Sequence, residues 1–94
     1  MARTRYLVSY DISDPKRLRH VAKTCESFGT RIQYSVFECP LDDLRLEKLK
    51  HALLTTINHD EDQVLFISLG PEHSPFRIVA LGQPYTERSR VTII

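Results

Sequence analysis

Residues 5–15 read RYLVSYDISDP, a stretch that alternates like a β-strand and then reaches a helix start. Side chains along a strand point to opposite faces in turn, so one face carries Tyr6, Val8 and Tyr10. The other face carries Leu7 and Ser9, and Asp11 follows on it. A carboxylate that ends an apolar strand is held rigidly at the rim of a sheet and still meets water. The stretch therefore predicts a strand that presents Asp11 at its exposed end.

A helix is predicted directly after this strand, over about residues 15–28. Asp14 can cap it, and Pro15 suits its first turn because the fixed φ of proline is already helical. The apolar residues at helical spacing are Leu18, Val21, Ala22, Cys25 and Phe28. The rest of the helix is basic and carries Lys16, Arg17, Arg19, His20 and Lys23. Gly29 is the expected stop signal.

The remaining elements follow from hydrophobic period and turn chemistry. Residues 30–39 alternate and are rich in β-branched and aromatic side chains, which predicts either one strand or two short strands broken near 33–35. A second helix is predicted over 42–57, with Asp42 or Asp43 as its cap. Three further strands are predicted at 64–69, 76–81 and 88–94.

This order of elements predicts an α+β fold with two helices on one face of an antiparallel sheet. If residues 30–39 hold two strands, the plan is a ferredoxin-like βαββαβ sandwich with an additional C-terminal strand. A chain of 94 residues makes a single domain, 1–94. Because the second sheet face has no helix to cover it, we expect a homodimer.

Charge is unevenly distributed, although the net charge is only +1. Residues 1–31 carry seven Lys/Arg against three Asp/Glu, a net of +4, and residues 38–62 carry three against seven, a net of −4. The basic third is compatible with a phosphate-bearing partner, but on charge alone a solvated helix face is the simpler interpretation. The acidic turn at 58–62 lacks the spacing of a calcium loop and is interpreted as solvated.

Several classes of protein are excluded by absent signals. No apolar run approaches the ~20 residues that span a bilayer, and the N-terminus does not resemble a signal peptide. Cys25 and Cys39 have no partner ligands at zinc-site spacing and are expected to be reduced thiols. We therefore predict a cytoplasmic protein without membrane contact. Nucleophile-elbow, Walker and dinucleotide-binding motifs are also absent, which leaves Tyr10 with Asp11, near several arginines, as the compact candidate site.

Two motifs resemble those of the CRISPR-associated protein 2 family, also called CRISPR-associated endoribonuclease. The first is the strand end at residues 10–14, YDISD, followed by the basic helix. The second and more specific motif is FGTRIQYSVFEC at residues 28–39. Length, order of elements and the C-terminal tail also agree, so the resemblance covers the whole chain.

The resemblance implies a homodimer of ferredoxin-like subunits in which the C-terminal segment, 82–94, pairs with the partner subunit. It implies that Asp11 binds the metal and that two copies share one Mg²⁺ across the two-fold axis. Mn²⁺ suits the same carboxylate and water ligands. The catalytic residues implied are Asp11 and Tyr10. The nucleic-acid-binding residues implied are Arg17, Arg19, Arg31 and Phe37.

The implied function is a metal-dependent endonuclease of CRISPR adaptation, which maintains the repeat element and defends against foreign nucleic acid. Its substrate is single-stranded RNA or double-stranded DNA, a choice that the sequence leaves open. Its implied partner is the spacer integrase, CRISPR-associated protein 1. The metal would activate water and neutralise phosphate charge, and the arginines would hold phosphates.

Two alternatives remain open. The first is a non-catalytic adaptor that bridges integrase subunits and binds duplex DNA through phosphate contacts, with Asp11 dispensable. The second is an unrelated ferredoxin-like RNA-binding module. Such modules stack bases on aromatic side chains exposed on the sheet. The candidates here are Tyr10, Tyr34 and Phe37.

Overall fold

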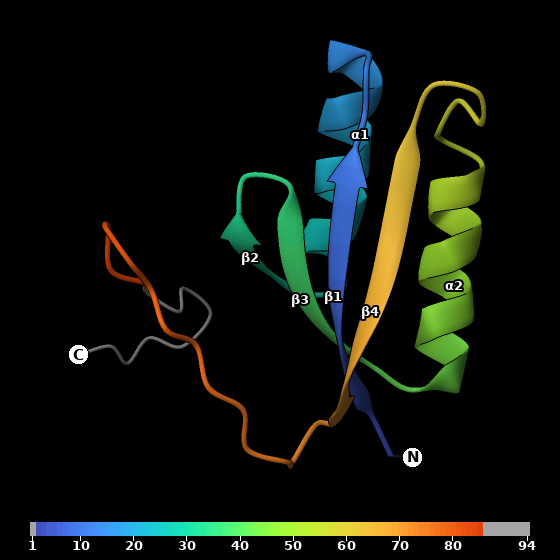
Figure 1. The fold of residues 1–94 in the computed structure, drawn as a ribbon. Helices are drawn as coiled ribbons and strands as arrows, with labels where there is room; N and C mark the ends of the chain where they lie inside the picture. Colours follow the sequence, from blue (N-terminus) through green and yellow to red (C-terminus); the bar gives the residue numbers. More distant parts are fainter. Residues whose placement is uncertain (1, 86–94) are drawn as a thin grey trace.

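The computed structural model describes residues 2–85, which form an α+β fold around a four-stranded sheet. The elements in chain order are β1 (Thr4–Asp11), α1 (Pro15–Glu26), β2 (Thr30–Gln33), β3 (Val36–Leu41), α2 (Asp43–Leu54) and β4 (Gln63–Pro71). The strands lie in the order β2-β3-β1-β4, and both helices cover the same face of the sheet (Figure 1). This is the ferredoxin-like βαββαβ arrangement, so the predicted fold class is confirmed.

β1 lies inside the sheet because it pairs antiparallel with β3 on one side and with β4 on the other. The predicted alternation is present. Val8 and Tyr10 are buried, whereas Asp11 is exposed at the end of the strand. A strand with a neighbour on each side has its backbone fixed by two ladders of hydrogen bonds. The backbone of Asp11, at the end of this strand, is therefore held rigidly.

Both helices begin at aspartate caps, as predicted. The carboxylate of Asp14 accepts a hydrogen bond from the backbone N–H of Arg17 at 2.9 Å. The carboxylate of Asp42 accepts one from the backbone N–H of Arg45 at 2.8 Å. Each bond satisfies one of the N–H groups that the first helical turn leaves without a partner. Both helices end within one turn before the residue that the sequence predicts.

The segment 30–39 forms two strands rather than one. A turn at 34–35 separates β2 from β3, and these strands pair with Arg31 opposite Phe37. β2 therefore becomes an edge strand of the sheet and carries Arg31 to that edge.

The predicted strand at 76–81 is wrong, because this segment belongs to neither a helix nor a strand. β1 already has a neighbour on each side, so a returning strand could join only at the outer edge of β4 or β2. The chain instead leaves β4 and passes beside β2 (Figure 1), where Ile78 lines a pocket with Ile32. Val79 and Leu81 are largely exposed. An apolar run is therefore not evidence of pairing within its own chain.

The predicted strand at 88–94 lies outside the described residues, as does most of the C-terminal segment 82–94. Its pairing with a partner subunit stays a prediction. Neither of the helices in the described part of the chain is long and apolar enough to cross a membrane.

The core lies between the sheet and the two helices. Its buried members are Val8, Tyr10, Ile12, Val21, Cys25, Phe37, Cys39, Leu41, Leu49 and Leu53. Both cysteines are free thiols within this core. Burial raises the pKa of Cys25 and of Cys39 to about 12. Because the thiolate is the reactive form, neither side chain is a nucleophile at neutral pH.

Candidate metal and nucleic-acid site

Asp11 is the last residue of β1 and lies opposite Gln63 of β4. Its side chain is exposed, and within residues 2–85 it forms no hydrogen bond or ion pair. Both carboxylate oxygens therefore remain available to a cation. In the same part of the chain no group of three or more His, Cys, Asp or Glu side chains is arranged to hold a metal. One chain thus offers a metal the Asp11 carboxylate rather than a closed set of ligands.

Tyr10 follows the opposite face of β1 and lies in the core, where it is 5% exposed. Its ring stacks on Phe37 with the centroids 6.3 Å apart, and its hydroxyl donates to the carbonyl of Tyr34 at 3.4 Å. Burial raises the pKa of this hydroxyl. Within one chain the structure does not bring the side chains of Tyr10 and Asp11 together, and Tyr10 instead holds the β2–β3 turn.

Phe37 is fully buried, so the expectation that its ring touches nucleic acid does not fit the structure. The guanidinium carbon of Arg31 lies 5.1 Å from the centroid of this ring and 5.7 Å from that of Tyr34. An arginine over an aromatic face is stabilised by the ring quadrupole. Phe37 therefore supports Arg31 from inside the protein.

Arg17 is committed to an ion-pair network at the start of α1. Its Nε donates to Asp62 at 2.8 Å and its Nη2 donates to Glu61 at 3.1 Å. The side chain of Asp62 is 0% exposed and also accepts from the backbone N–H groups of Ser13 at 3.0 Å and Asn58 at 2.8 Å. The interpretation of the acidic turn as solvated therefore holds for the exposed side chains of Asp60 and Glu61 and is wrong for Asp62. The turn ties the loop after β1 to the loop before β4.

The role of Asp62 could not be predicted from the local sequence. The signals were present, since a basic helix start and an acidic turn are complementary charges, but their positions in the sequence are 45 residues apart. The consequence for the site is indirect. Arg17 is less free to bind phosphate than the sequence suggests, and it fixes the loop that follows Asp11.

The network predicts an acid-sensitive contribution to stability. The hydrogen bond from Arg17, together with those from the backbone of Asn58 and Ser13, holds the pKa of Asp62 well below its usual range. A lowered carboxyl pKa stabilises the folded state fully above the unfolded pKa of about 3.9, and this contribution is lost as the pH falls toward the folded pKa. We expect Asp62→Asn to lower the melting temperature at pH 7 by about 5–10 °C.

Thermal unfolding at several pH values between about 7 and 3 tests this, because the difference between Asp62→Asn and wild type should narrow below about pH 4. Asp60→Asn is the matched control, since Asp60 is exposed and forms no ion pair within the described residues. A difference that stays constant down to pH 3 would contradict the assignment.

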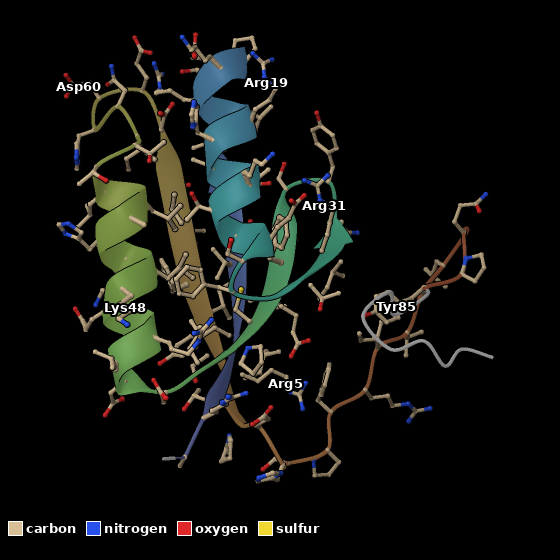
Figure 2. All side chains as sticks on the ribbon, turned by 180° about the vertical axis from the view of Figure 1, so that it is seen from behind. Arg5, Arg19, Arg31, Lys48, Asp60 and Tyr85 are labelled. Carbon is tan, nitrogen blue, oxygen red and sulfur yellow. The ribbon has the colours of Figure 1, made fainter. Side chains whose placement is uncertain are left out.

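A small pocket joins α1 to the β2–β3 hairpin. It has a volume of about 230 Å³ and is lined by Tyr10, Leu18, Arg19, Ala22, Arg31 and Tyr34. Figure 2 shows Arg19 on α1 and Arg31 on β2 along the same side of the molecule. The structure therefore brings these two arginines together and leaves Asp11 and Arg17 elsewhere.

The surface around this pocket is basic and not neutralised. Lys16, Arg19 and Lys23 are exposed on α1, and Arg31 is half-buried on β2. None of the four forms an ion pair with a carboxylate within residues 2–85. Cations without a protein partner are available to phosphate groups.

Comparison with known proteins finds relatives of this chain in sequence and in fold. The profile of the family described as "CRISPR associated protein Cas2" matches residues 4–74. A curated relative from Geobacter sulfurreducens, named CRISPR-associated endoribonuclease Cas2, is 39% identical over 90 residues and covers 95% of each chain. A relative from Halalkalibacterium halodurans, named CRISPR-associated endonuclease Cas2, is 41% identical over 69 residues, which is 68% of this chain and 72% of the relative.

Solved structures with a similar fold come from the same family. A crystal structure of Streptococcus pyogenes Cas2 superposes with a TM-score of 0.74 at 40% identity, covering 83% of this chain and 99% of that one. The match of the family profile spans β1 to β4 and includes Asp11, Arg19 and Arg31. The chain therefore belongs to the CRISPR-associated protein Cas2 family.

Proposed function

We propose that this protein is a metal-dependent endonuclease of CRISPR adaptation, which acts as a homodimer on phosphodiester bonds of single-stranded RNA or double-stranded DNA. The observation that carries the proposal is Asp11, an exposed carboxylate without a partner in the described chain, held at the end of an inner strand. Relatives named endoribonuclease and endonuclease support the reaction class.

The residues present fit a Mg²⁺ ion, with Mn²⁺ as a possible substitute. Mg²⁺ takes oxygen ligands, keeps several waters and is commonly bound by one or two carboxylates together with substrate phosphate. Asp11 supplies one carboxylate, and the same residue of a second copy would supply another, which is why the active form is proposed to be a dimer. When bound, the ion would lower the pKa of water and neutralise charge on the phosphate.

The protein's own residues would position the substrate. Arg19 and Arg31 would donate to phosphate oxygens, since a guanidinium offers a planar pair of N–H groups that matches two oxygens. Arg17 would act as a positioning residue by fixing the loop after Asp11 through Asp62. The buried hydroxyl of Tyr10 would hold the hairpin that carries Arg31.

We expect Asp11→Asn to reduce cleavage at least about 100-fold, because it removes the proposed metal-binding charge and keeps the side-chain volume. Purified wild type and variant are incubated with single-stranded RNA and with duplex DNA, in Mg²⁺ and in chelator, after the dimer is verified by light scattering. Asp60→Asn is the control. Cleavage by Asp11→Asn at the rate of wild type would exclude Asp11 as the metal ligand.

The second candidate function is a non-catalytic adaptor that binds duplex DNA and bridges subunits of the integrase, CRISPR-associated protein 1. The basic side chains of α1 and β2 that form no ion pair in residues 2–85 favour this function. Contacts to phosphate alone give binding that depends on salt and is indifferent to sequence. A folded wild-type dimer that binds duplex DNA and cleaves neither substrate would select the adaptor, and Asp11→Asn would then bind as wild type does.

A further inference from the structure

Tyr34 is an exposed aromatic residue at the β2–β3 turn, and it lines a pocket together with Arg19 and Arg31. It is 72% exposed, although the sheet next to it buries Tyr10 and Phe37 almost completely. The ring lies beside the Arg31 guanidinium and otherwise faces water, so most of its surface is accessible to a ligand. The backbone of Tyr34 is held at the β2–β3 turn, because its carbonyl oxygen accepts a hydrogen bond from the hydroxyl of the buried Tyr10.

The surroundings of this ring suit an unpaired nucleobase. Leu18 and Ala22 give the pocket an apolar wall, and Arg19 and Arg31 provide donors at the same pocket. Its volume of about 230 Å³ is below the range of about 300–1,000 Å³ typical of drug-sized ligands and suits a smaller group. The Arg31 guanidinium lies over the Tyr34 ring at 5.7 Å, so cation and aromatic surface are adjacent.

We infer that Tyr34 is a stacking platform for an unpaired base of a single-stranded nucleic acid, with Arg31 and Arg19 holding the adjoining phosphates. Stacking on an aromatic ring is sequence-tolerant because every base presents a π-face, and a basic groove beside the ring tracks the backbone. The inference rests on the proposed function for the class of ligand, and it adds a preference for strands whose bases are free. A base inside a duplex is stacked on its neighbours and cannot enter the pocket.

The test compares two short single strands of equal length, an oligothymidylate and an abasic strand with the same phosphates. Affinity is measured by fluorescence anisotropy in chelator, so that no cleavage occurs. We expect wild type to bind the base-bearing strand about 5- to 150-fold more tightly than the abasic strand, the range that base–aromatic stacking supplies. We expect Tyr34→Ala to lose this preference and keep its affinity for the abasic strand.

Two controls make the result specific. Tyr34→Phe keeps the ring and should bind as wild type does. Leu54→Ala removes an exposed apolar side chain from α2, 53% exposed, and should change neither affinity. A preference that survives in Tyr34→Ala, an equal loss of affinity for both strands, or no preference in wild type would each overturn the inference. Because the assay needs neither metal nor Asp11, its outcome is independent of whether the protein cleaves.

Discussion

Gly29→Ala should destabilise the protein by about 3 kcal/mol or more, which lowers the melting temperature by about 12–24 °C. A Cβ at this position would lie 2.3 Å from the carbonyl oxygen of Glu38, 2.6 Å from the Sγ of Cys39 and 2.8 Å from its Cα. Two of these atoms belong to the backbone of β3, which cannot move without disturbing the sheet. Thermal and urea unfolding at pH 7 measure the effect.

The reason for this glycine differs from the one that the sequence suggests. A glycine after a helix usually adopts the left-handed conformation, but in the described chain only Gly70 and Gly82 have positive φ. If conformation were all that mattered at Gly29, alanine would be neutral or slightly stabilising. The glycine is required because α1 leads into β2 through a close approach to β3.

Gly70→Ala is the matched control, since Gly70 has a φ of +101° and a Cβ there would meet nothing within 4 Å. It should cost about 1–2 kcal/mol from backbone strain alone. Adding Cys39→Ala to Gly29→Ala removes the sulfur contact and leaves both backbone contacts, so it should not restore stability. A Gly29→Ala protein as stable as wild type would show that the approach is looser in solution.

Glu38→Leu should destabilise the protein by about 3–5 kcal/mol, because it leaves the largely buried charge of Arg5 without a carboxylate partner. Arg5 Nη1 lies 2.6 Å from Glu38 Oε2, and the two side chains are only 14% and 10% exposed. Arg5 also donates to the carbonyl of Glu72 at 2.5 Å and lies 4.4 Å from the ring centroid of Phe76. The pair thus anchors the chain that follows β4.

A double-mutant cycle, measured by urea unfolding, separates the interaction energy of the Arg5–Glu38 pair from the cost of burying either charge alone. Arg5→Met alone should be destabilising like Glu38→Leu, whereas the two substitutions together should be closer to wild type than either alone, because no isolated charge remains. A surface pair would contribute only about 0–1 kcal/mol. A loss of that size for both single variants would therefore show that water reaches the pair.

Local rules were sufficient for much of the fold. The alternation of β1, the caps at Asp14 and Asp42 and the exposed position of Asp11 depend on neighbours within a few residues, so they could be predicted. The family resemblance supplied the choice of Arg19 and Arg31 as site residues, and the structure places both at one pocket.

Other features depend on contacts that are distant in sequence. The apolar run at 76–81 predicts a strand, but a strand forms only where a sheet edge pairs with it. In the described chain no strand pairs with this segment. The local sequence around Phe37 is the same whether its ring faces the core or the exposed face of the sheet. Its register opposite Val8 is what buries it.

The sequence alone therefore determined the order of elements from β1 to β4, apart from the break between β2 and β3, and the carboxylate at the end of β1, because propensity, periodicity and capping act over a few residues. Only the tertiary structure decided that Arg17 binds Asp62, that Gly29 is needed for space rather than for φ, and that Tyr34 stays exposed beside Arg31. These are properties of segments that meet only after folding, when packing and charge pairing between distant residues select among the patterns that the sequence allows.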